Sequence, residues 1–320
     1  MILNYYQIVV LVNRFNNMKK VLIAFAFLFL GLEAFACDAC GCAATGSYSG
    51  IYPQFSKNLF GIRYGFTEFT HPNTTLNYNG DSRVYKDYFQ RFEAWGRFYP
   101  SDKVQLFVFV PYQVHRREEE RRATEISGVG DITILANYAL VNTGDSLDRK
   151  FNHTLLLGGG FTLPTGKYQE RDEGQQMLPA QFQIGTGAYS LSTQLNYTIR
   201  HKGFGINTEL SYTFRDVNER SYRFGESANM AISGFYWITT EKMAILPNVG
   251  WSYEEYQHDL EYGQPKAETG GNMQFLNLGV DINYRRLFLR GFIQNPLSQD
   301  LPDSQPTSGV RWNASVSYVF

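Results

Sequence analysis

The chain has 320 residues, a formal net charge of -1, and charged side chains at only 18% of positions. A chain this close to neutral has no electrostatic basis for binding nucleic acid, so we expect no nucleic-acid partner. Aromatic residues make up 16% of the chain, and so high a share with so few charges favours a β-rich protein with interfacial aromatic girdles over a cytosolic enzyme.

The first predicted element is a secretory signal peptide. Two lysines precede an apolar run over residues 21–32, and a small-residue A-x-A motif follows at residues 34–36. This order is typical of a signal peptide, and the apolar run is too short to span a bilayer. We therefore expect residues 1–36 to be an upstream extension plus the signal peptide.

The mature chain is expected to begin at Cys37, with residues 37–58 forming a periplasmic segment. Cys37, Cys40 and Cys42 are the only cysteines, and their C-x-x-C-x-C spacing brings three thiols close enough to share one soft metal ion such as zinc or copper. The same spacing permits a local disulfide in an oxidising envelope, and a Cys directly after the cleavage site permits lipidation. No cofactor is certain, and the sequence leaves these three chemistries open.

Residues 59–320 carry strands in which apolar and polar residues alternate. Side chains along a strand point to opposite faces with a period of two. In residues 204–215 and 276–285 the alternation lasts for about ten residues, the length that a tilted strand needs to cross the hydrocarbon layer. Long polar segments alternate with short turns, as in transmembrane barrels. The long segments are 71–83, 115–126, 166–180, 216–226, 257–271 and 296–307.

This pattern predicts an all-β protein. We expect residues 59–320 to form a transmembrane antiparallel β-barrel of about 12 strands in the outer membrane of a Gram-negative bacterium. Within the second long segment, the charged run at 115–122 is interpreted as a solvated loop.

Three glycine-containing motifs carry a family resemblance. They lie at residues 127–132 (SGVGDI), 157–166 (LGGGFTLPTG) and 183–187 (QIGTG). In these motifs the chain resembles the outer-membrane barrel family labelled for the meta-pathway of phenol degradation, from about residue 59 to the end. The resemblance implies an envelope transporter or channel. It does not imply phenol as the solute, and the cysteine cluster is not part of the family pattern.

The same glycines also have an interpretation that involves no ligand. Gly128 and Gly130 are followed neither by a third glycine at dinucleotide-binding spacing nor by a predicted helix. We therefore expect the glycines to permit bends in the barrel wall or the packing of large rings on neighbouring strands.

The last predicted strand, residues 309–320, has one apolar and one polar face and ends on Phe320. A terminal aromatic residue is common on the closing strand of outer-membrane barrels, where the insertion machinery recognises it. We therefore expect the insertion machinery and outer-membrane lipid as partners. The alternative for this segment is the last strand of a soluble sandwich.

The polar faces of the strands assign ten charged residues to the barrel lumen. With about twelve strands, the lumen should be wider than the packed interior of an eight-stranded barrel and narrower than an open porin. Charges of both signs in such a space pair into a partial plug or form a filter for a polar or ionic solute. The candidate pore-lining residues are Arg63, Arg91, Glu93, Arg97, Asp131, Glu209, Arg215, Asp281, Arg285 and Arg311.

Together these features predict a channel or transporter that passes small solutes across the outer membrane. A metal-handling protein that uses the cysteine cluster is the alternative, and a structural barrel is less favoured. We expect no enzymatic activity. His115 and His258 fall near the expected outer rim, but neither has a serine beside it in a motif recognisable from an outer-membrane lipolytic enzyme.

Overall fold

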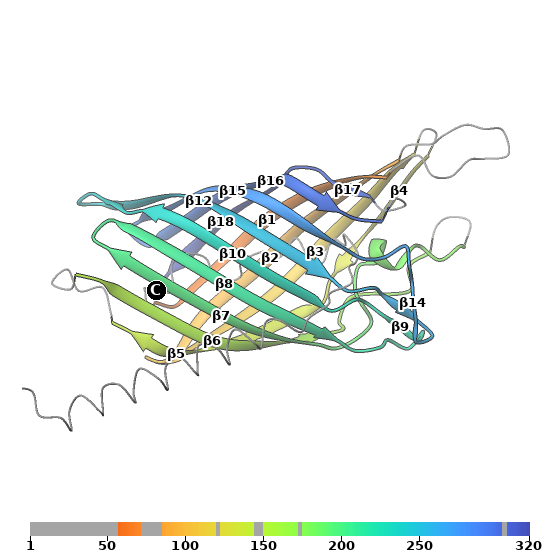
Figure 1. The fold of residues 1–320 in the computed structure, drawn as a ribbon, viewed down its shortest axis with the longest axis horizontal. Helices are drawn as coiled ribbons and strands as arrows, with labels where there is room; N and C mark the ends of the chain where they lie inside the picture. The colour runs from red at the N-terminus through yellow and green to blue at the C-terminus, as the bar shows by residue number, and fades with distance from the viewer. Residues whose placement is uncertain (1–56, 72–84, 120–121, 144–149, 172–174, 303–305) are drawn as a thin grey trace, which may run out of the picture. The chain divides into compact units, whose positions relative to one another are not determined.

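The computed structural model describes residues 57–71, 85–119, 122–143, 150–171, 175–302 and 306–320 (Figure 1). The chain divides into two compact units, Met1–Phe35 and Ala36–Phe320, and all described residues belong to the second. The predicted signal peptide and cysteine cluster lie outside the described residues. Among the residues that are described, no helix is long and apolar enough to cross a membrane.

Twelve long antiparallel strands of the described residues form a closed barrel, as predicted. They are β1 (Leu59–His71), β2 (Tyr85–Ser101), β3 (Val104–Glu119), β5 (Ile132–Asn142), β6 (Asn152–Leu163), β7 (Ser190–His201), β8 (Phe204–Arg215), β10 (Ser227–Tyr236), β12 (Met243–Tyr256), β15 (Gly271–Tyr284), β16 (Leu287–Asp300) and β18 (Arg311–Val319). The short elements are β4 (Arg122–Val129), η2 (Ala180–Phe182), β9 (Tyr222–Arg223), β11 (Ile238–Thr239), β13 (Leu260–Glu261), β14 (Gln264–Pro265) and β17 (Thr307–Ser308).

The barrel closes where the first strand pairs with the last. β1 runs antiparallel to β18 in a continuous register from Leu59 opposite Val319 to Phe66 opposite Trp312. Each of the other long strands pairs with the long strands before and after it in the chain. Closure leaves no open sheet edge in the wall, which is the condition for a β-sheet to be stable in lipid.

The two faces of the wall differ as the alternation predicts. On β18, Trp312 and Val316 are exposed on the outer surface, whereas Arg311 and Ser317 are each 1% exposed and face inward. The same division holds on β15, where Leu278 is exposed and Asp281 is buried. An apolar outer face around a polar interior is the arrangement of a transmembrane barrel.

The connections also divide as expected. Two-residue turns join β2 to β3, β7 to β8 and β15 to β16 at one end of the barrel. Lys202 and Arg285 have φ angles of 52° and 56° in two of these turns, the left-handed conformation that tight hairpin turns require. The long connections at the other end carry a small sheet in which β13 pairs with β9 and β14.

Residues 115–119 of the charged run lie in a strand, which corrects the interpretation of this run as a solvated loop. β3 continues to Glu119, and β4 returns alongside it from Arg122. A charge pair joins this part of β3 to β2: Arg117 Nε and Nη2 donate to the two carboxylate oxygens of Asp87, each at 2.7 Å. Alternating charges on neighbouring strands therefore extend the barrel wall at this end.

Because the outer face of the wall is apolar, the effect of a new charged side chain on the free energy of unfolding should depend on the face that carries it. Leu278→Arg should lower the free energy of unfolding by about 2–4 kcal/mol because it places a guanidinium in the hydrocarbon layer. Asn277→Arg, on the inner face of the same strand, should cost clearly less. Urea titration in detergent micelles or vesicles, followed by heat-modifiable mobility on gels, measures both; equal costs would contradict the assignment of faces.

Candidate functional site: the barrel lumen

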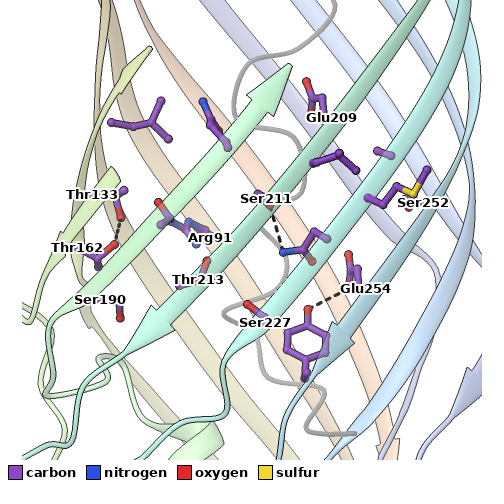
Figure 2. Close-up of a pocket in the computed structure, with 18 of the residues that line it drawn as sticks. Arg91, Thr133, Thr162, Ser190, Glu209, Ser211, Thr213, Ser227, Ser252 and Glu254 are labelled. Carbon is purple, nitrogen blue, oxygen red and sulfur yellow. Dashed lines mark hydrogen bonds between the residues drawn. The ribbon is translucent and has the colours of Figure 1, made fainter. Parts of the chain in front are cut away.

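The barrel encloses a cavity of about 200 Å³. Its wall on β7, β8, β10 and β12 carries hydroxyl and amide side chains, and Figure 2 shows that Ser190, Ser211, Thr213, Ser227 and Ser252 project into the interior. Hydroxyl and amide groups offer both donors and acceptors without a net charge. The cavity therefore suits a small solute that hydrogen-bonds.

The predicted lumen charges on β1 and β2 form one cluster. The Glu93 carboxylate is fully buried and pairs with two guanidinium groups, those of Arg63 and Arg91. The Arg91 Nη2 atom lies 2.6 Å from Glu93 Oε2, and Arg91 lines the cavity. Because two cations share one anion, this cluster adds positive charge to the wall.

A second ion pair joins β18 to β12. Arg311 Nη1 lies 3.0 and 2.9 Å from the two carboxylate oxygens of Glu254, and its guanidinium stacks 4.2 Å from the Phe275 ring centre. The Tyr256 hydroxyl donates to the same carboxylate at 3.0 Å. The sequence prediction included Arg311 but missed Glu254. The signal was present, because Ser252, Glu254 and Tyr256 follow the period of two on one face of β12.

A third pair lies between β15 and β16. Asp281 is fully buried, and Arg290 Nε lies 3.4 Å from its Oδ1 atom. The sequence prediction missed Arg290, although it is the one basic residue of β16. Arg290 lines the cavity.

Asp131 holds a segment that folds into one end of the barrel. Its Oδ1 atom accepts a hydrogen bond from the Gly166 amide at 2.8 Å. Its Oδ2 atom accepts from the Thr186 amide at 2.8 Å and from the Thr186 hydroxyl at 2.6 Å. The two ends of the segment, residues 166 and 186, are therefore fixed to the wall by one carboxylate.

Two motif glycines allow this closure. The backbones of Gly166 and Gly185 lie so close that a Cβ on Gly185 would approach the Gly166 carbonyl oxygen to 2.4 Å. The Gly185 amide donates to the Lys167 carbonyl at 2.9 Å. At these positions the glycines permit backbone-to-backbone contact between the two ends of the segment, in place of the ring packing or strand bending expected from the sequence.

The segment inserts an aromatic ring into the lumen. Phe182, at the end of η2, is 1% exposed and packs edge-on against Phe89 of β2. The Phe182 carbonyl lies 2.9 Å from His115 Nδ1. The apolar cluster around it, here called the mouth cluster, comprises Phe69, Phe89, Leu178, Phe182, Tyr256, Met273 and Phe275. It joins β1, β2, β12 and β15 across the inside of the barrel and narrows the lumen at the end with the long connections.

Asp259 ties the long connections together. Its carboxylate accepts hydrogen bonds from the Gly225 amide at 2.6 Å, from Gln181 Nε2 at 3.1 Å and from the Tyr222 hydroxyl. Burial raises the pKa of the Asp259 carboxyl above its usual value, although these donors oppose the shift. Three connections thus form one polar network over the mouth cluster.

The structure places the ten predicted pore-lining residues in three groups. Those that line the cavity are Arg91, Asp131, Glu209 and Arg215. Those that lie on the inner face in ion pairs or in buried positions are Arg63, Glu93, Arg97, Asp281 and Arg311. Arg285, expected in the lumen, instead lies exposed in the turn between β15 and β16, because β15 ends one residue before it.

Metal ligation by the cysteine cluster stays a prediction, since those residues lie outside the described ranges. Within the described part of the chain, no group of three His, Cys, Asp or Glu side chains is arranged to hold a metal ion.

Comparison with known proteins agrees with this architecture. Residues 67–286 match the model of the family described as "Putative MetA-pathway of phenol degradation". An outer-membrane channel from Pseudomonas putida has the same fold, with a TM-score of 0.60, 15% sequence identity, and coverage of 83% of this chain and 96% of that one. The transport unit of an Escherichia coli autotransporter aligns less well, with a TM-score of 0.48, 8% identity, and coverage of 87% and 96%. No curated protein matches the sequence.

The contacts of Asp131 predict how firmly the inserted segment is held. Asp131→Ala removes three hydrogen bonds to a carboxylate, so the segment should detach more often, and trypsin should cut at Lys167 and Arg171 about tenfold faster or more. Thr133→Ala, on the same face of the neighbouring strand β5, is the matched control. An unchanged rate of tryptic cleavage in folded Asp131→Ala protein would contradict the inference that Asp131 holds the inserted segment to the wall.

Proposed function

Because the chain belongs to the family described as "Putative MetA-pathway of phenol degradation", and its fold is that of an outer-membrane barrel, we propose that it is a channel passing small solutes across the outer membrane. The observation that carries this proposal is the hydrogen-bonding cavity inside the closed wall. The hydroxyl and amide groups of this lining substitute for part of a solute's hydration without binding it irreversibly.

The size of the solute is limited by the inserted segment. The mouth cluster places Phe182 and Leu178 across the inside of the barrel, where an open porin would have water. Because the cluster packs against the wall and is fixed through Asp131, passage requires either a narrow path beside it or its displacement. This arrangement supports small solutes over oligomers.

Transport, in place of hydrolysis, is the activity that we infer. A histidine acting as a general base needs a free ring nitrogen facing its substrate. The two ring nitrogens of His115 are engaged by the Phe182 carbonyl at 2.9 Å and by Gln113 Oε1 at 2.7 Å. His258 Nδ1 contacts the Thr269 carbonyl. His115 thus has both ring nitrogens engaged by the fold, and the His258 contact joins two parts of one long connection.

We also propose a second, compatible function in metal handling. Its basis is the C-x-x-C-x-C spacing of Cys37, Cys40 and Cys42, which places three soft ligands within six residues. A zinc or copper ion bound there would be carried on the segment that precedes β1.

The channel proposal predicts discrete conductance steps when the refolded chain is inserted in a planar bilayer. Phe182→Ala should increase the step size because it removes the ring that the inserted segment contributes to the mouth cluster. Phe214→Ala, which removes an exposed ring on the outer face, is the control and should leave the step size unchanged. A folded, heat-modifiable barrel that gives no steps in any of the three forms would overturn the proposal.

The metal proposal predicts about one zinc or copper ion per chain after incubation and desalting, measured by mass spectrometry of the elements. Combined Cys37→Ser, Cys40→Ser and Cys42→Ser substitution should abolish binding. Combined Thr45→Ala, Ser47→Ala and Ser49→Ala substitution, in the same segment, should not. Equal metal content in the two variants would contradict a thiol site.

A further inference from the structure

Arg290 differs from Arg311, the other inward-facing arginine of the strands β16 and β18, in how its guanidinium is used. Its Nε atom faces Asp281 at 3.4 Å, and its Cζ atom lies 5.4 Å from the Phe292 ring centre. The side chain is 20% exposed and lines the cavity. Within the described residues, neither terminal nitrogen, Nη1 or Nη2, has a hydrogen-bond partner. Arg290 is therefore a cavity-lining residue whose two terminal nitrogens the described residues leave available.

The comparison with Arg311 shows that this is not a general feature of the wall. Arg311 is 1% exposed, and each of its nitrogens has a partner: Nη1 binds Glu254, Nε binds the Ser308 hydroxyl, and Nη2 contacts the Met273 sulfur. All three nitrogens of the Arg311 guanidinium therefore have partners within the fold. The terminal nitrogens of Arg290 do not, because Asp281 approaches only its Nε side.

Asp281 gives the arrangement its rigidity. The carboxylate is fully buried, and in the described structure neither of its oxygens accepts a hydrogen bond. Burying a carboxylate that accepts no hydrogen bond costs desolvation free energy, and the positive charge of Arg290 offsets part of that cost. The attraction acts on the Nε side of Arg290, and Asp281 itself is not among the residues that line the cavity.

Neutral polar groups continue the wall along β15, β16 and β12. Gln294 Nε2 donates to Asn277 Oδ1 at 3.1 Å and lies 3.5 Å from the Ser252 hydroxyl. All three residues line the same cavity as Arg290. Beside Arg290, the cavity thus offers amides and hydroxyls that match the hydroxyl groups of a solute.

We propose that the lumen binds small hydroxylated carboxylates, with the two terminal nitrogens of Arg290 donating to the solute's carboxylate and the amide and hydroxyl wall contacting its hydroxyl groups. A planar guanidinium matches a carboxylate through two parallel hydrogen bonds, which a point charge such as Lys does not provide. This inference deepens the proposed channel function, since it names the class of solute that the channel recognises.

The test is equilibrium binding by calorimetry to the full chain, folded in detergent, with gluconate as the probe and sorbitol as its uncharged analogue. Wild type should prefer gluconate. The double variant Asp281→Asn with Arg290→Gln keeps the net charge of the lumen and should weaken gluconate binding by about tenfold or more, with sorbitol unchanged. The matched control is Glu254→Gln with Arg311→Gln, which removes an ion pair whose guanidinium is fully engaged and should retain gluconate binding.

The outcomes distinguish binding at Arg290 from a general attraction between an anionic solute and the charges of the lumen. Equal loss in the two charge-neutral doubles, or equal binding of gluconate and sorbitol by wild type, would overturn the assignment to Arg290. If the Asp281→Asn, Arg290→Gln double variant does not fold, Arg290→Lys is used instead, because it keeps the charge but removes the planar guanidinium. Undiminished gluconate binding by Arg290→Lys would also overturn the assignment to Arg290. Binding is read without conductance, so a wild type that binds gluconate but does not conduct overturns the channel alone.

Discussion

Hydrogen bonding of the backbone in lipid is the constraint on which this structure depends. A strand in the hydrocarbon layer has no water to satisfy its N–H and C=O groups, so the sheet must close on itself. The pairing of β1 with β18 provides that closure, and it fixes which side chains face lipid and which face the lumen. The cavity, its ion pairs and the inserted segment all lie in the interior that this closure creates.

Inside the barrel, the cost of burying charge decides how each charged residue is used. Glu93 and Asp281 are both fully buried, and each has arginine as its charge partner. The attraction within such a pair mainly offsets the free energy lost when its two charges are desolvated, so the pair adds little net stability to the fold. Their value lies in geometry, because a paired side chain has a fixed position. Arg311 uses that geometry to join β18 to β12, whereas Arg290 retains two donors for the cavity.

The inserted segment shows how the interior of a wide barrel is partly filled. A lumen bounded by twelve strands leaves space that side chains of the wall alone do not fill. The mouth cluster fills part of it with Phe182 and Leu178, and Asp131 and Asp259 attach the segment and its neighbouring connections by hydrogen bonds. The lumen also holds a cavity of about 200 Å³ whose lining includes many polar groups, a space suited to a small solute.

The sequence by itself determined the strands, their two faces and the alternation of short and long connections, because a period of two and the chemistry of turns are local properties. It also placed Arg63, Glu93 and Arg311 on the inner face. Only the tertiary structure decided that Arg311 meets Glu254, that Arg290 faces the cavity, and that the charged run after Val114 extends a strand. Periodicity gives the face of a residue but not its partner across the barrel, since such contacts depend on register, closure and the path of the inserted segment.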